Sequence, residues 1–209
     1  MAETFAQSRA RSLGFRRAEA PDAGFVAGMI DLSNAGADTD REQAIANVLA
    51  EGSDVGFANS IIADLDGEAV AAMVLNHAGT LPEKVEHCLP DHQPYVRLRL
   101  QVPSSLYLRN IATIPDCRGM GVGRALLKLA CTISLQSGAD GLSAIVHRRN
   151  FEMQGLLSAL GFRLVANDYL ASHGTLGKVW KSASGFGIKP PESQEPEMGR
   201  SNCLRDTSC

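Results

Sequence analysis

The sequence lacks the features that mark most nucleic-acid-binding, membrane-spanning and secreted proteins. Its 209 residues carry a formal net charge of -3, whereas a nucleic-acid-binding surface is usually strongly basic. Apolar runs are short and interrupted, so none approaches the roughly 20 residues that cross a bilayer. Residues 1–17 lack the apolar centre of a signal peptide. We therefore expect a cytoplasmic protein that binds neither nucleic acid nor membrane.

Cysteines are few and irregularly spaced, which indicates neither a disulfide framework nor a zinc site. They are Cys88, Cys117, Cys131, Cys203 and Cys209. Reduced thiols agree with a cytoplasmic location. His87 and His92 lie beside Cys88 in the sequence, but a fourth ligand at a suitable spacing is missing. We predict no metal site.

Composition divides the chain into one domain with two polar ends. Hydrophobic residues make up 44% of the sequence, which is enough for one core and too little for two full domains. From residue 182 onward the chain is polar, proline-rich and aperiodic. We expect a flexible segment at 1–12, a folded domain over 13–181 and a disordered tail at 182–209.

Hydrophobic periodicity predicts an alternation of helices and strands. Apolar residues at helical spacing predict helices at 21–33, 39–52, 122–136 and 150–162. The second helix has Thr39 and Glu42 at the spacing of a capping box. Apolar runs bounded by turn signals predict strands at 14–18, 57–65, 68–76, 104–113, 141–147, 162–170 and 176–181. Asp66 and Gly67 form the strongest hairpin signal, between the second and third strands.

Residues 77–103 are harder to interpret, because they contain four prolines and three histidines and show no clear period. A connection of this length in a compact domain is more often a functional lid or a disordered segment than a plain link. We interpret it as an insertion that forms a lid over an acceptor site. Arg97, Arg99 and Arg109 either attract an acidic acceptor or form the solvated side of a strand, and the second interpretation is preferred.

A glycine-rich loop between a predicted strand and a predicted helix is the most informative feature of the chain. Gly119, Gly121 and Gly123 lie between Arg118 and Arg124. Without side chains, the amides at the helix start can approach one anion closely, and the helix dipole assists them. A pyrophosphate fits this description. The spacing matches neither the dinucleotide fingerprint nor the phosphate loop of nucleotide hydrolases.

The spacing Arg118-x-x-Gly121-x-Gly123 resembles the cofactor motif [QR]-x-x-G-x-[GA] of the GCN5-related N-acetyltransferase (GNAT) family. The resemblance extends to the flanks. Residues 106–127 look like the family's fourth strand, loop and third helix, and residues 143–162 are similar to its fifth strand, asparagine and "LGF"-ended helix. It implies an α/β (α+β) fold, in which about four helices flank a mixed, mostly antiparallel twisted sheet of about six to seven strands. The fourth and fifth strands splay apart.

By this resemblance the cofactor is acetyl-CoA. Its pantetheine arm would pair with the backbone of Ile111, Ala112 and Thr113 as an added strand. The pyrophosphate would be held by the amides of Gly119, Met120, Gly121, Val122, Gly123 and Arg124, with Arg118 and Arg124 favouring its charge. Asn150 would contact the pantetheine region near the splay.

Acetyl transfer to an amine also requires residues that move protons, both a base and an acid. The family's usual acid, a tyrosine, corresponds to Leu157 here. The family's glutamate base corresponds to Tyr107, whose hydroxyl suits an acid or a proton relay better than a base. His147, at a strand end beside the splay, is a candidate base. The alternatives are a packed strand aromatic for Tyr107 and a solvated histidine for His147.

The resulting hypothesis is an N-acetyltransferase that moves acetyl from acetyl-CoA to a primary amine of a small molecule or peptide, by direct attack in a ternary complex. The missing tyrosine keeps a second hypothesis open, a non-catalytic acyl-CoA-binding sensor. A third is transfer of a larger acyl group, if small residues such as Ala112 and Ser143 widen the cleft. Members of this fold often pair as homodimers, although no segment shows an obvious interface stripe.

Overall fold

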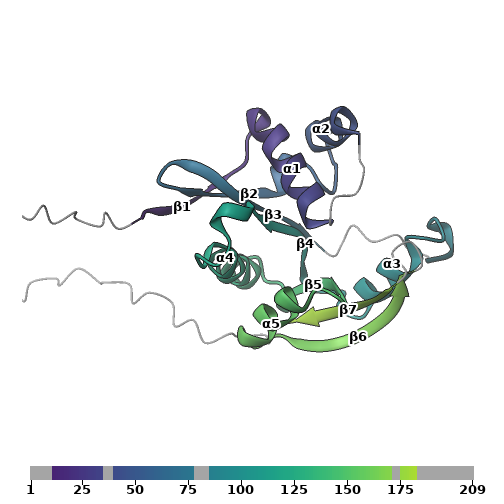
Figure 1. Ribbon diagram of the computed structural model, residues 1–209. Coiled ribbons are helices and arrows are strands. Elements are labelled where there is room, and N and C mark those ends of the chain that lie inside the picture. Colours follow the sequence, from purple (N-terminus) through teal and green to yellow (C-terminus); the bar gives the residue numbers. More distant parts are fainter. Residues whose placement is uncertain (1–10, 35–39, 78–84, 171–174, 183–209) are drawn as a thin grey trace, which may run out of the picture.

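Seven strands of the described part of the chain form one twisted sheet in the order β1-β2-β3-β4-β5-β7-β6 (Figure 1). The computed structural model describes residues 11–34, 40–77, 85–170 and 175–182. The strands are β1 (Leu13–Arg17), β2 (Ser60–Leu65), β3 (Glu68–His77), β4 (Leu106–Thr113), β5 (Leu142–His147), β6 (Arg163–Leu170) and β7 (Thr175–Lys181). β4 and β5 run parallel, and the other described neighbours run antiparallel. The expected mixed, mostly antiparallel sheet is confirmed.

β4 and β5 separate soon after they meet. Residues 106–108 pair with residues 142–144, and no further pairing of β4 with β5 occurs among the described residues. On its other edge, β4 pairs with β3, and there β4 contains one extra residue, Arg109. Val74 of β3 lies opposite Asn110, while the next residue, Leu75, lies opposite Leu108. Such a bulge increases the local bend and twist. The second half of β4 therefore has one edge open, which is the expected splay.

Among the described residues, five α-helices cover the two faces of the sheet: α1 (Ala23–Ser33), α2 (Arg41–Leu49), α3 (Gln93–Leu100), α4 (Val122–Gln136) and α5 (Phe151–Ala159) (Figure 1). α4 and α5 bury their apolar sides against the largest core cluster, together with alternate residues of β3, β4 and β5. The opposite face is covered by α1 and α2 over β2 and β3, and by α3 over β5 to β7. Strand alternation explains this division, since Ala144 and Val146 face α4 while Ile145 faces α3.

Residues 77–103 contain a helix, α3, that the sequence analysis did not predict. Gln93–Leu100 is helical, and Pro94 lies in its first turn. Proline is tolerated there because a backbone N–H in the first turn has no acceptor within the helix. Leu98 and Val102 pack against Leu170 and Val179, so this part of the segment belongs to the core. Arg97 and Arg99 accordingly lie on a helix and not on a strand. Residues 78–84 of the expected lid lie outside the described residues.

One local detail departs from expectation and another is confirmed. The cap of α2 is Asp40, whose carboxylate accepts a hydrogen bond from the Glu42 amide at 3.0 Å, while Thr39 lies outside the described residues. The Asp66-Gly67 hairpin is confirmed, with positive φ of 55° and 90° at its two turn residues.

The described domain extends slightly past the expected boundaries. Ser12 makes two hydrogen bonds with Asp66: its amide donates to the Asp66 carboxylate, and its carbonyl accepts from the Asp66 amide. Ser182 is buried, and its hydroxyl accepts from the Leu142 amide at 2.8 Å. The expectations for 1–10 and 183–209 fall outside the described residues. In the part of the chain that is described, no helix is long and apolar enough to cross a membrane.

Burial of Cys131 gives stability a measurable pH dependence. Its side chain lies in the α4 core, and burial raises the pKa of this thiol from 9.0 to about 11. Because the folded-state pKa exceeds the unfolded value, stability present below pH 9 is lost as pH rises toward 11. We expect the wild type to lose about 2 kcal/mol more unfolding free energy than Cys131→Ala between pH 8 and 11, measured by urea unfolding. Equal losses would contradict this.

Candidate active site

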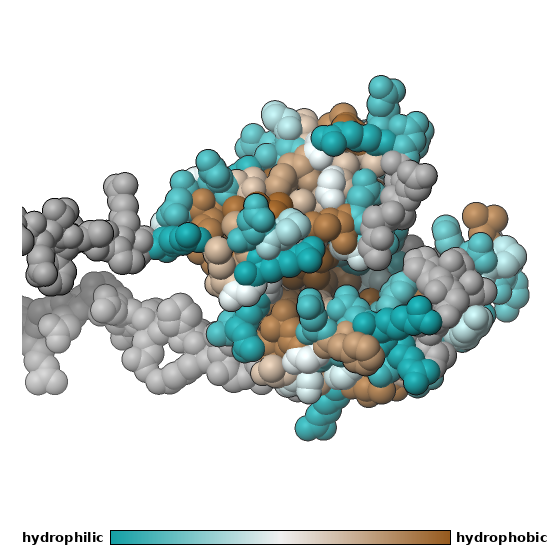
Figure 2. Space-filling view, in the orientation of Figure 1, coloured by the Kyte–Doolittle hydropathy of each residue, from teal (hydrophilic) through white to brown (hydrophobic). Residues whose placement is uncertain are grey.

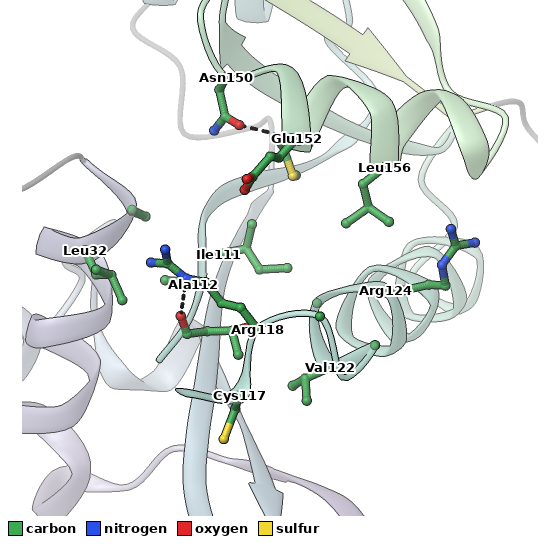
Figure 3. Close-up of a pocket in the computed structure, with 16 residues that line it drawn as sticks. Leu32, Ile111, Ala112, Cys117, Arg118, Val122, Arg124, Asn150, Glu152 and Leu156 are labelled. Carbon is green, nitrogen blue, oxygen red and sulfur yellow. Dashed lines mark hydrogen bonds between the residues drawn. The ribbon is translucent and has the colours of Figure 1, made fainter. Parts of the chain in front are cut away.

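A cleft of about 520 Å³ lies where β4, the start of α4, α5 and the end of α1 meet (Figure 3). In the space-filling view, apolar side chains are visible in a hollow between the part built by α1 and β2 to β4 and the part built by α5 and β6 (Figure 2). The predicted cofactor-binding residues, apart from Met120, line this cleft. The fold thus brings predicted cofactor-binding residues that are up to 39 positions apart in the sequence, from Ile111 to Asn150, to one cleft.

The glycine loop presents a row of unused backbone donors. Gly119 and Gly121 have positive φ, 75° and 85°, and Gly121 is the N-cap of α4. Such values favour glycine strongly, because a side chain there is strained. Among the described residues, no backbone carbonyl accepts from the amides of residues 119–124, whereas the Ala125 amide already bonds to Gly121. These amides and the positive end of the helix dipole suit an anion.

The two flanking arginines do not converge. The guanidinium of Arg118 extends back over β4 toward Leu32, and its Nε donates to the Thr113 carbonyl at 3.3 Å (Figure 3). Arg124 is exposed on α4. Met120 points elsewhere, since its sulfur contacts a guanidinium nitrogen of Arg11 at 3.1 Å. The side chain of Met120 therefore takes no part in lining the cleft, although its amide remains in the row.

The other predicted cofactor residues lie along the open part of β4 and at the start of α5. Ile111, Ala112 and Thr113 belong to the half of β4 that β5 does not pair with. Asn150 caps α5, its side-chain oxygen accepting from the Met153 amide at 3.0 Å. Asn150 also lines the cleft. An extended chain bound along β4 could pair with that edge as an added strand does.

Several lining residues escaped the sequence analysis: Leu32, Ser33, Cys117, Glu152, Met153 and Leu156. Ser33 is positioned by Asn110, whose side-chain nitrogen donates to its hydroxyl at 2.6 Å and so fixes the end of α1 against β4. The expected acid position, Leu157, is fully buried in the core. Its neighbour Leu156 faces the cleft instead. Helical register, which the sequence leaves uncertain by one residue, decides between the two.

Tyr107 lies on the sheet face opposite α4. It is 7% exposed, and the guanidinium carbon of Arg99 lies 4.6 Å from its ring centroid. Burial raises the pKa of Tyr107. The phenol is therefore protonated throughout the neutral range, so it can donate a proton but is unsuited to act as a base.

His147 is not brought next to Tyr107. Ser143 is the direct partner of Tyr107 across β4 and β5, and His147 lies four residues further along β5, about 13 Å at the rise of a strand. The strands also diverge over that distance. The carbonyl of His147 accepts hydrogen bonds from Asn150 and Gln154, which ties β5 to α5. The two candidate catalytic residues thus cannot share one reacting atom without an intervening relay.

Within the described ranges, no three histidine, cysteine, aspartate or glutamate side chains gather closely enough to hold a metal ion. Ser143 is buried and shares a 2.6 Å hydrogen bond with Ser105. It therefore does not widen the cleft, which removes one of the two residues suggested for a larger acyl group.

Comparison with known proteins agrees with this geometry. The profile of the Acetyltransferase (GNAT) family matches residues 32–162. A crystal structure of an acetyltransferase superposes with a TM-score of 0.62 at 18% identity, covering 82% of this chain and 99% of that one. Ribosomal-protein-S18-alanine N-acetyltransferase from Escherichia coli gives 0.57 at 17% identity, covering 83% and 94%. An N-acetyltransferase from Staphylococcus aureus Mu50 gives 0.60 at 12% identity, covering 80% and 99%. No curated protein matches significantly.

The chain belongs to the GNAT acetyltransferase family, since the family profile covers more than half of it. At these identities the structural neighbours establish the fold and not the substrate.

Proposed function

We propose that the protein is an N-acetyltransferase that binds acetyl-CoA in the β4–α4 cleft and transfers acetyl directly to a primary amine of a small molecule or peptide. The observation that carries the proposal is the row of unbonded amides at 119–124, in a loop that lines the same cleft as the unpaired part of β4. An anionic group and an extended polar arm are the two chemistries that these surfaces accept. Acetyl-CoA has both and supplies the acetyl thioester.

The residues of the chain then divide into binding and proton-handling groups. The amides of the glycine loop hold the pyrophosphate, and the open edge of β4 orients the pantetheine arm so that the thioester lies near the Arg109 bulge. Amides of β4 polarise the thioester carbonyl as an oxyanion hole would. The Tyr107 phenol, which is buried and does not line the cleft, returns a proton to the departing thiolate through a water relay. Water removes the proton from the attacking ammonium.

Tyr107→Phe tests the proton donor. Removing the hydroxyl while keeping the ring is expected to lower kcat about 10²-fold, with little change in acetyl-CoA affinity, because a positioned acid typically contributes 10²- to 10⁴-fold. The measurement is steady-state thiol release together with cofactor titration. His147→Gln is the parallel variant. It is expected to change kcat less than Tyr107→Phe does, because His147 lies four residues along β5 from Ser143, the partner of Tyr107. An unchanged kcat for Tyr107→Phe would remove Tyr107 from the mechanism.

One observation favours a second function, a non-catalytic acyl-CoA sensor. Leu157 stands where the family's acid is expected, and it is fully buried, so it offers no chemistry. Release of free thiol from acetyl-CoA over a panel of primary amines separates the two. Amine-dependent turnover that scales with protein concentration supports the enzyme. Tight acetyl-CoA binding without turnover for any amine would favour the sensor.

A further inference from the structure

Arg99 is a buried cation that lacks hydrogen-bond partners. The residue is 9% exposed, and within the described structure its Nε and one terminal nitrogen, Nη2, are buried without any acceptor. Its guanidinium stacks over Tyr107 at 4.6 Å. An unpaired buried charge is expensive to maintain, so natural proteins pair such groups or use them to bind an anion. α3 is held by Leu98 and Val102, which leaves Arg99 facing the β4 side.

The charges around Arg99 leave positive charge in excess. Burial lowers the pKa of Arg99, while Tyr107 and Asp54 oppose this effect and Arg109 adds to it. Asp54 is also 3.7 Å from a terminal nitrogen of Arg109. One carboxylate is therefore shared between two guanidinium groups. The further arginine on α3, Arg97, points outward and is paired with Asp168 at 2.6 Å.

A second unpartnered group extends this polar row toward a cavity. Asn76 lies directly opposite Tyr107 across β3 and β4, so their side chains are neighbours on one sheet face. It is 4% exposed, and both atoms of its amide lack partners within the described structure. Asn76 lines a cavity of about 450 Å³, and so does Asp54. Arg99, Tyr107 and Asn76 thus form a continuous row on the face opposite α4.

We propose that this row, with Arg99 as its charged end, binds a carboxylate carried by the amine acceptor. The inference rests on the proposed acetyl transfer and specifies its acceptor class. A planar guanidinium matches a carboxylate through two parallel hydrogen bonds. Nε and Nη2 of Arg99 are enclosed and have no acceptor within the described structure, so a bound carboxylate would satisfy both. The excess positive charge disfavours acceptors that carry a second ammonium group. A carboxylate at Arg99 leaves the amine of the same molecule to reach the β4 bulge.

The test uses ω-amino acids with one to five methylenes as acceptors, each compared with its ω-amino amide. Wild type is expected to acetylate the acids with about 10- to 100-fold higher kcat/KM than the amides at the best chain length, as charge-assisted hydrogen bonds of ordinary strength predict. Arg99→Met should remove this preference by weakening the acids while sparing the amides. Arg97→Gln, on the same helix but outside the row, should keep it.

Folding of the variant is checked by thermal unfolding. Arg99→Met is expected to raise Tm by about 2–4 °C, since it removes a buried unpaired charge. Equal kcat/KM for acids and amides in the wild type, or a preference that survives Arg99→Met, would overturn the inference and leave acetyl transfer intact. If no amine in either series releases thiol, the proposed function fails together with the inference.

Discussion

Gly121→Val is expected to weaken acetyl-CoA binding by at least about 100-fold. Gly121 has a positive φ of 85° at the N-cap of α4, and a side chain there would project into open space within the cleft. That space is where the pyrophosphate would meet the loop amides. Losing two charge-assisted hydrogen bonds of about 1.5 kcal/mol each is equivalent to about 100-fold in Kd. Isothermal titration of acetyl-CoA measures the effect.

Gly138→Val is the matched control, because valine at either glycine introduces the same backbone strain. Gly138 has a φ of 74° just past the end of α4, also with open space around it, and lies outside the cleft. Both variants should lose roughly 1–2 kcal/mol of unfolding free energy, the cost of a left-handed side chain. Gly138→Val should bind acetyl-CoA like the wild type. Equal affinities in the two variants would show that the loop does not hold the cofactor.

Leu126→Ala is expected to lower the free energy of unfolding by about 3 kcal/mol. Leu126 is fully buried on α4, within the cluster that joins α4 to β3, β4 and β5. Truncation removes buried apolar surface and leaves a cavity that the surrounding residues fill incompletely. Urea unfolding monitored by circular dichroism provides the measurement.

Leu135→Ala supplies the comparison on the same helix. Leu135 is 39% exposed, so its truncation should cost less than about 1 kcal/mol. Losses of similar size at Leu126 and Leu135 would contradict the orientation of α4 against the sheet. Saturating acetyl-CoA should restore part of the stability of Leu126→Ala by mass action, because the glycine loop precedes this residue and is unaltered.

Local chemistry made part of this structure predictable. Asp66-Gly67 requires positive φ at both turn residues, which few other dipeptides tolerate, and the hairpin formed as expected. The glycine loop was predictable for a similar reason. Its glycines permit the positive φ values that the loop adopts, and the residues on either side indicate a strand before it and a helix after it. The order of the strands, in contrast, depends on contacts between distant segments and was not predicted. The family resemblance supplied the mixed, mostly antiparallel sheet and the splay between its fourth and fifth strands.

α3 and Arg99 show where sequence reasoning failed. Prolines and charges in 77–103 suppress the apolar period, and the packing of Leu98 and Val102 on β6 and β7 supplies the stability that propensity does not. The sequence suggested a solvated Arg99, and burial at that position becomes visible after α3 is placed. Leu156 and Leu157 show the same limit, since the choice of which side chain faces the cleft is a matter of helix rotation.

The most direct test of the central claim, that the β4–α4 cleft binds acetyl-CoA, is thermal unfolding with and without the ligand. A ligand that binds the folded state raises its stability by about 2.7 kcal/mol at a hundredfold excess over Kd. Tm of the wild type is expected to rise saturably with acetyl-CoA, and free CoA should reproduce the rise, whereas Gly121→Val should show none. No rise at millimolar acetyl-CoA would contradict the claim and reduce the glycine loop to a structural turn.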